Sequence, residues 1–354
     1  MRGFLAIRDV GLFSGRFFGR AGSCAGELVH FRSKSFCWDI FTDPVYKNKI
    51  VVTDPVCLEN RQPSPEENRS FMPHLSALVL LGKVERPVDT PEGSSLLDYM
   101  QANRICGFIP DRRDLLYDVL SFSNPTQAAL DRSGDRALEL SNNSLPKGAD
   151  GLRSLASPAE FFWDLSNGYA IQEKASLVVW DFGTSYKLLQ TLKIKGCSLR
   201  LVPPDTPAED IVALHPDGVV ISGNGLPDRD RNRIMFEVER MIGIRPLLGI
   251  GGGAVTLASA LGMETYHLSD PHFGTAIPVE EIDTGKISAT YQTHSNGIDL
   301  HSAEDSGAQI THINVCDDSV EAYSIDDYQI VGSLYYDSFM EEPPYLRRFL
   351  NLLG

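Results

Sequence analysis

The sequence predicts an α/β protein built from two domains, on the strength of three observations. The chain of 354 residues is long enough for two domains of about 100–200 residues each. Its content of 42% apolar and 22% charged residues is that of a globular protein with a sizeable core. In the second half, continuous apolar runs alternate with segments of helical spacing, a pattern typical of an open, mainly parallel sheet with helices on both faces.

The first domain, expected over 1–150, mixes short strand-like runs with polar turns. A hairpin is expected at the start, and a helix over 95–100 with Ser94 or Ser95 as N-cap, because a serine hydroxyl accepts a hydrogen bond from an unpaired amide of the first turn. The Pro- and Gly-containing stretch near 142–157 predicts a break before a linker at 151–174. The expected strands are 4–7, 12–13, 27–31, 50–53 and 77–81, with a loop at 61–68.

The second domain, expected over 175–354, has the more regular pattern. Continuous apolar runs predict buried strands, and apolar residues at helical spacing between them predict the connecting helices. Such a sheet places its functional site at the carboxyl ends of its strands. The expected strands are 176–180, 198–202, 218–222 and 246–250, and the expected helices are 187–195, 208–214, 231–242 and 254–261.

Charge and cysteine content exclude several classes of function. The formal net charge of −15 would repel phosphate backbones, so we expect no nucleic-acid partner. No window reaches the roughly 18 uncharged apolar residues of a membrane span, so we expect no membrane partner. The six cysteines are scattered and form no C-x-x-C pair, which favours reduced thiols in a cytoplasmic protein without a cofactor. The arginine-containing first residues alternate like strands, which favours a folded hairpin over a transit peptide.

A glycine-rich turn, 249–253, lies between the fourth predicted strand and an apolar helix. Gly249, Gly251 and Ala254 fit the dinucleotide pattern G-x-G-x-x-A, but no acidic residue ends a strand about 20 positions later, as that site requires. A second interpretation is a nucleophile elbow, in which the strained middle residue presents its side chain to the site. Gly251 stands at that position and has no side chain. A third interpretation, a tight turn that only packs, agrees best with these residues.

Motifs in both halves are similar to those of one enzyme family. The segment 41–46 (FTDPVY) is similar to the family's L-T-D-P-S-Y, and the segment 95–99 (SLLDY) is similar to its S-L-S-D-Y. In the second half, 179–183 (VWDFG) and 216–219 (PDGV) agree with V-x-Y-D-F-G and P-D-G-V. The whole chain resembles the small, glutaminase subunit of carbamoyl phosphate synthetase. This resemblance implies a class I glutamine amidotransferase-like second domain, partnership with the large subunit of the synthetase, and a place in pyrimidine and arginine biosynthesis.

The residues that carry the family's chemistry have changed. Where the family has the attacking cysteine of G-I-C-L-G, this chain has Gly251. Tyr336 and Ser338 stand at the positions of the histidine base and the glutamate that orients it. A phenol with a pKa of about 10 is a poor base at neutral pH. Because amide hydrolysis by this route needs nucleophile, base and orienting group together, the resemblance implies a small chain without the usual glutaminase chemistry.

Some residues at the family's glutamine-binding positions are retained. By resemblance, the candidate ligand-binding residues are Ser33, Asn224, Gly225, Gln292 and His294. His272 and His294 are both interpreted as structural or loop histidines rather than as bases. The spacing of the histidines between 267 and 312 matches no metal-ligand motif, so we expect no metal site. Asp317 and Asp318 are expected in a solvated turn.

Two alternatives remain open at this stage. The chain is a stand-alone ligand-sensing or interaction protein without a synthetase partner, or it is a glutaminase with a relocated nucleophile. For the second alternative, Cys37 is the candidate nucleophile, because it lies near Ser33 in the sequence. A lone cysteine in a strand is more often a buried residue of the apolar core.

Overall fold

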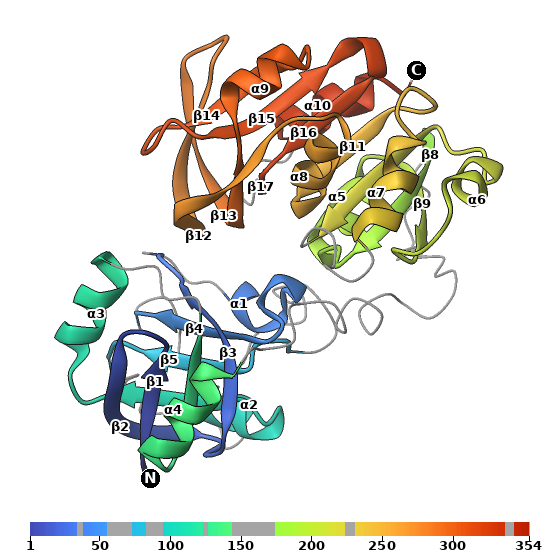
Figure 1. Cartoon of the computed structure of the whole chain (residues 1–354). Coiled ribbons are helices and arrows are strands. Elements are labelled where there is room, and N and C mark those ends of the chain that lie inside the picture. The colour runs from blue at the N-terminus through green and yellow to red at the C-terminus, as the bar shows by residue number, and fades with distance from the viewer. Residues whose placement is uncertain are drawn as a thin grey trace. The chain divides into compact units, whose positions relative to one another are not determined.

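The computed structural model describes residues 1–33, 38–54, 73–82, 95–122, 127–143, 174–223, 231–336 and 343–353. The chain forms two compact units, Met1–Lys147 and Gly148–Gly354 (Figure 1). The linker expected at 151–174 lies outside the described residues except for Lys174, so it stays a prediction. Within the described ranges, every helix is too short or too polar to cross a lipid bilayer.

The first unit is a closed seven-stranded barrel. Its strand order is β1-β2-β6-β5-β4-β3-β7, and β7 pairs with β1 to close it. The expected hairpin is confirmed, because β1 and β2 pair in antiparallel register from Arg2↔Arg16 to Ile7↔Gly11. The strands are β1 (Arg2–Ile7), β2 (Gly11–Gly19), β3 (Cys24–His30), β4 (Lys49–Thr53), β5 (Ala77–Leu80), β6 (Cys106–Pro110) and β7 (Ala128–Asp131).

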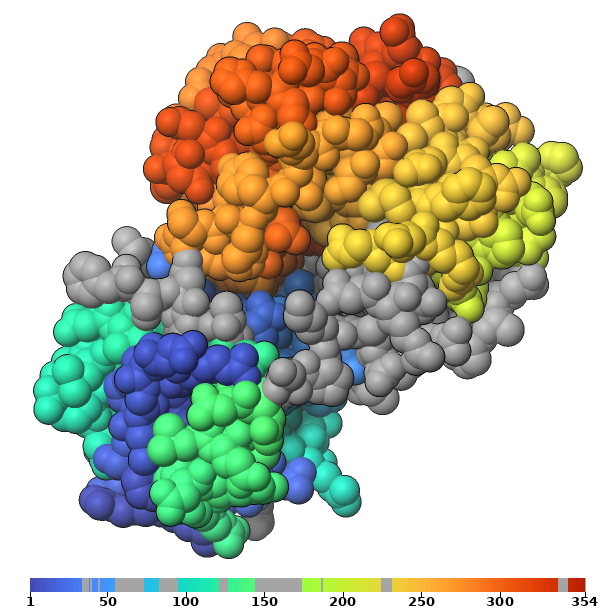
Figure 2. Space-filling view, in the orientation of Figure 1, coloured from blue at the N-terminus to red at the C-terminus, as the bar shows by residue number. Residues whose placement is uncertain are grey.

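Helices pack against the strands of the barrel. Ser95 is the N-cap of α2, as the sequence predicts: its hydroxyl accepts from the Asp98 amide at 3.2 Å, and the Asp98 carboxylate accepts from the Ser95 amide at 3.1 Å. Helix α4 lies beside β1 on the surface (Figure 2), where Arg8 Nε donates to the Ser141 carbonyl at 2.9 Å. The helical segments are α1 (Asp39–Thr42), a 3-10 turn (Pro44–Tyr46), α2 (Leu96–Ala102), α3 (Arg113–Phe122) and α4 (Gly134–Asn142).

His74, which precedes β5, should make the stability of the first unit depend on pH. Burial and the charge of Lys47 lower the pKa of His74 to about 4. The unfolded chain, with a pKa near 6.5, then binds more protons than the folded chain, so stability is complete above pH 6.5 and falls as the pH drops towards 4. Between pH 7 and pH 5 we expect a loss of about 1–2 kcal/mol. Urea unfolding of the wild type and of His74→Gln at both pH values measures it; equal pH dependence in both would contradict this assignment.

The second unit contains a ten-stranded sheet with a parallel and an antiparallel part. The order is β17-β13-β12-β14-β15-β16-β11-β10-β8-β9. The parallel part holds the four predicted strands and a fifth: β8 (Ala175–Phe182), β9 (Cys197–Val202), β10 (Gly218–Gly223), β11 (Leu247–Gly251) and β16 (Ile330–Ser333). The antiparallel part was not anticipated strand by strand: β12 (Thr265–Glu281), β13 (Lys286–Ile298), β14 (Gln309–Asn314), β15 (Val320–Ile325) and β17 (Tyr335–Tyr336).

Helices cover both faces of the parallel part, which makes three layers. Along β8, Val178 and Trp180 pack with α6, α7 and α8 on one face. Leu177 and Val179 pack with α5 and α10 on the other face, as alternation along a strand requires. The predicted helices are confirmed to within a few residues. The helices are α5 (Tyr186–Ile194), α6 (Ala208–Ala213), α7 (Arg231–Glu239), α8 (Gly252–Ala260), α9 (Leu300–Asp305) and α10 (Pro344–Asn351), with a 3-10 turn at Asp326–Tyr328.

The parallel register brings several strand ends to one edge of the sheet. Gly223, the last residue of β10, pairs with Phe182 of β8 and with Gly251 of β11. On the other side of β11, Ile250 pairs with Ser333 at the end of β16. The glycine-rich turn and the residues after β16 therefore meet at this carboxyl edge, where open α/β sheets place their sites.

Candidate active-site elbow and a buried histidine–glutamate cluster

The glycine-rich turn has the geometry of an elbow between β11 and α8. Gly251 has φ 60° and ψ −127°, a conformation that strains any residue with a side chain. Gly253 has a different reason to be glycine, since a Cβ added there would lie 2.0 Å from the carbonyl oxygen of Ile221 in β10. At Gly253 the backbone of α8 therefore lies directly against β10. The predicted strand–turn–helix is confirmed, with the strained conformation at the position that the elbow interpretation gave it.

Tyr336 fills the space in front of the elbow. A Cβ added to Gly251 would lie 2.6 Å from the Tyr336 hydroxyl oxygen and 3.2 Å from its Cζ. Tyr336 ends β17, which pairs it with Tyr291 of β13, and the two rings lie 6.2 Å apart between centroids. Position 251 therefore offers no nucleophile, and a side chain introduced there would meet the phenol.

Of the five candidate ligand-binding residues, the structure describes Ser33, Gln292 and His294. Gln292 is fully buried, and its amide nitrogen donates to Thr290 Oγ1 at 3.1 Å. Gln292 follows Tyr291 along β13 and pairs with Tyr335, so it faces the side of the sheet opposite to Tyr291 and Tyr336. Ser33 is a half-buried residue of the first unit. Asn224 and Gly225, like Ser338 and Cys37, lie outside the described residues. A ligand-binding role for these positions stays a prediction.

His294 belongs instead to a buried group that we call the histidine–glutamate cluster: His272 of β12, His294 of β13 and Glu321 of β15. The two histidines are cross-strand partners, with ring centroids 4.9 Å apart in an edge-to-face arrangement. His272 Nδ1 lies 3.1 Å from Glu321 Oε1, and His294 Nε2 lies 3.5 Å from Glu321 Oε2. Glu321 is 0% exposed, and Asn314 Nδ2 donates to its Oε1 at 3.0 Å. One carboxylate thus faces two imidazole nitrogens away from solvent.

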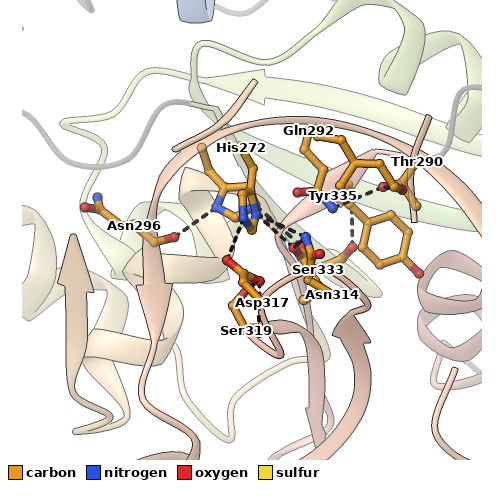
Figure 3. A network of polar contacts seen from close by, with 12 residues as sticks. His272, Thr290, Gln292, Asn296, Asn314, Asp317, Ser319, Ser333 and Tyr335 are labelled. Carbon is orange, nitrogen blue, oxygen red and sulfur yellow. Dashed lines mark hydrogen bonds and ion pairs between the residues drawn. The ribbon is translucent and has the colours of Figure 1, made fainter. Parts of the chain in front are cut away.

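The outer nitrogens of both rings face oxygen atoms that accept hydrogen bonds. His272 Nε2 lies 3.0 Å from the Asp317 carboxylate, and His294 Nδ1 lies 2.9 Å from the backbone carbonyl of Asn296 (Figure 3). An ionised carboxylate and a carbonyl only accept, so each ring donates through its outer nitrogen. The proton on each outer nitrogen is therefore fixed. The inner nitrogens, which face Glu321, either carry a second proton or present a lone pair.

The buried charges of the cluster shift its pKa values in opposite directions. Burial raises the pKa of Glu321, but the charge of His294 and the hydrogen bond from His272 outweigh it and bring this pKa to about 2. Burial lowers the pKa of His272, but the hydrogen bond and charge of Glu321, with Asp317 adding to them, raise it above its usual value. Positive charge between the rings and the carboxylate is therefore favoured.

Two members of this arrangement were missed in the sequence. Asp317 lies in an exposed turn, as expected, but its contact with His272 was not predicted, and it also accepts from the Ser319 hydroxyl at 2.8 Å. Glu321 was not singled out, although a signal for it was present. It is the one charged residue in the otherwise uncharged run Val320–Ile325, and a carboxylate inside such a strand requires buried partners.

Family models match the sequence of both units. Residues 5–119 match the family model "Carbamoyl-phosphate synthase small chain, CPSase domain", and residues 178–333 match "Glutamine amidotransferase class-I". Among solved structures, a glutamine amidotransferase from Thermotoga maritima is similar, with a TM-score of 0.35 and 16% identity over 52% of this chain and 82% of that one.

Curated relatives match nearly the full length. A carbamoyl phosphate synthase small chain from Syntrophotalea carbinolica is 31% identical over 335 residues, which cover 91% of this chain and 88% of the relative. Another from Aquifex aeolicus is 29% identical over 350 residues, which cover 94% and 92%. With both domains matched in order and a relative above 30% identity over most of its length, the chain belongs to the carbamoyl-phosphate synthase small chain family.

Proposed function

We propose that this small chain does not hydrolyse glutamine and acts as a structural or regulatory partner of the synthetase large subunit. The observation that carries the proposal is the 2.6 Å between the Tyr336 hydroxyl and the Cβ position of Gly251. A thioester intermediate needs a sulfur atom at the elbow and a base beside it. Here the elbow has no side chain, and a phenol lies where a side chain at position 251 would extend.

The rest of the chain supports retention of a binding role. Both family domains are present, and relatives named as small chains align over nine-tenths of this chain. The elbow also keeps its strained backbone, with φ 60° and ψ −127° at Gly251, so the turn persists without the group it is built to present. A fold preserved while its nucleophile is lost fits a partner that shapes or regulates the large subunit, in a cytoplasmic complex that makes carbamoyl phosphate for pyrimidines and arginine.

The proposal is tested with this chain and the large subunit encoded by the same organism. We expect the two to co-elute as a complex that makes carbamoyl phosphate from ammonia, bicarbonate and ATP, with glutamine giving no rate above the background without ammonia. A small chain that carries the family's cysteine, assayed with its own large subunit, is the positive control.

The two halves of the proposal fail separately. Saturable release of ammonia from glutamine by this chain would overturn the loss of hydrolysis, and labelling of Cys37 by an electrophilic glutamine analogue would locate a relocated nucleophile. Elution of this chain alone, as a monomer or homo-oligomer, would overturn the partnership and favour a stand-alone ligand-binding protein.

A further inference from the structure

We propose that His272, His294 and Glu321 bind one divalent transition-metal ion of zinc-like chemistry, which fastens the β12–β13 hairpin to β15. This inference is independent of whether the chain hydrolyses glutamine. It departs from the sequence-based expectation of no metal site, because the three ligands lie 22 and 27 residues apart along the chain and match no local spacing motif.

The ligand set and its spacing fit such an ion. Two imidazoles with one carboxylate are a common set for zinc and for related divalent transition metals. One donor atom from each of the three residues lies within 4.8 Å of the others. In a tetrahedral zinc site with bonds of about 2.0–2.1 Å, neighbouring donor atoms are about 3.3 Å apart. Each imidazole has its own carboxylate oxygen near that distance: His272 Nδ1 lies 3.1 Å from Glu321 Oε1, and His294 Nε2 lies 3.5 Å from Glu321 Oε2.

The outer nitrogens of both rings make the hydrogen bonds that are typical of metal-binding histidines. Metal-binding histidines donate their other ring N–H to a carboxylate or a backbone carbonyl, which fixes the tautomer and turns the lone pair towards the ion. His272 donates to the Asp317 carboxylate at 3.0 Å, and His294 donates to the Asn296 carbonyl at 2.9 Å. The inner nitrogens then face the Glu321 carboxylate either with a second proton or with a lone pair, and the lone-pair form is the one that can bind a metal ion beside the carboxylate.

Unpartnered buried atoms mark the place of that cation. Within the described part of the chain, neither His294 Nε2 nor Glu321 Oε2 has a hydrogen-bond partner, although both residues are buried. The 3.5 Å between these two atoms is too long for a good hydrogen bond, so both buried atoms lack a close polar partner. A metal ion would coordinate both atoms at once.

The test uses the full chain, stripped with a chelator, dialysed, and titrated with Zn²⁺ alone. We expect one Zn²⁺ per chain by metal analysis and a rise of several degrees in Tm at zinc in large excess over its dissociation constant. Glu321→Gln and His294→Asn should bind at least 100-fold more weakly. Asp317→Asn, which replaces the carboxylate behind His272 by a neutral amide, should bind about 10-fold more weakly. The matched control is His301→Asn, since His301 is an exposed histidine paired with Glu304 at 3.8 Å, and it should bind like the wild type.

A spectroscopic measurement on the wild type keeps the proposal falsifiable if the variants do not fold. Nitrogen NMR of the histidine rings in saturating Zn²⁺ should show His272 coordinated through Nδ1 and His294 through Nε2, each with a proton on its other nitrogen. Doubly protonated rings at both positions under the same conditions would overturn the proposal and assign the cluster to a pair of imidazolium ions. Equal zinc affinity in the wild type and in His294→Asn would overturn it as well.

Discussion

Gly251→Cys is expected to yield a less stable chain that still releases no ammonia from glutamine. The φ of 60° and ψ of −127° at this residue would cost a side-chain-bearing residue about 1–3 kcal/mol. The new Cβ would also lie 2.6 Å from the Tyr336 hydroxyl, and such overpacking costs about 1–3 kcal/mol more. A thiol placed there has no imidazole base at position 336, so it stays unactivated. Urea unfolding and a coupled ammonia assay measure the two effects.

A double-mutant cycle separates the clash from the backbone strain. Gly251→Ala and Tyr336→Ala should couple, with the double variant more stable than the sum of the single losses by about 0.5–3 kcal/mol. Gly262→Ala is the matched control, because Gly262 has φ 83° and no described heavy atom lies within 4 Å of an added Cβ. It should show no coupling to Tyr336→Ala. Additive losses at Gly251 and Tyr336, or glutaminase activity restored by the cysteine alone, would mean that the phenol does not fill the elbow.

Glu321→Ala is expected to destabilise the second unit by about 3–5 kcal/mol, the usual cost of removing one partner from a buried charge cluster. The carboxylate is 0% exposed and faces His272 at 3.1 Å and His294 at 3.5 Å, so its loss leaves two buried imidazoles without their counter-charge. Unfolding in urea with a chelator present measures this cost without any contribution from bound metal. The loss should appear in the transition of the second unit only.

Two further variants define what the charge contributes. Glu321→Gln keeps an acceptor for Asn314 Nδ2 but removes the counter-charge, so it should lose about 2–4 kcal/mol, which is less than Glu321→Ala by about the value of one hydrogen bond. Glu304→Ala breaks an exposed pair with His301 and should change stability by less than about 1 kcal/mol. If Glu321→Ala cost no more than Glu304→Ala, the cluster would not be a charged one, and the zinc proposal would lose its electrostatic basis.

Several elements of the fold can be predicted from short stretches of the sequence. The N-cap at Ser95 and the four parallel strands of the second unit follow from residue type and apolar periodicity, which act over a few neighbouring residues. The antiparallel strands β12 and β13 were harder to predict, because they are long, bulged and half exposed, and their sequence has neither a continuous apolar run nor strict alternation.

The sequence by itself determined the α/β class, the order of strands and helices around the elbow, and the absence of a side chain at position 251. Only the tertiary structure decided that Tyr336 occupies the space in front of Gly251, 85 residues earlier in the chain. It also decided that His272, His294 and Glu321 share one buried volume. The reason is physical: periodicity and caps depend on neighbours along the chain, whereas these contacts depend on sheet register, which pairs strands that the sequence keeps apart.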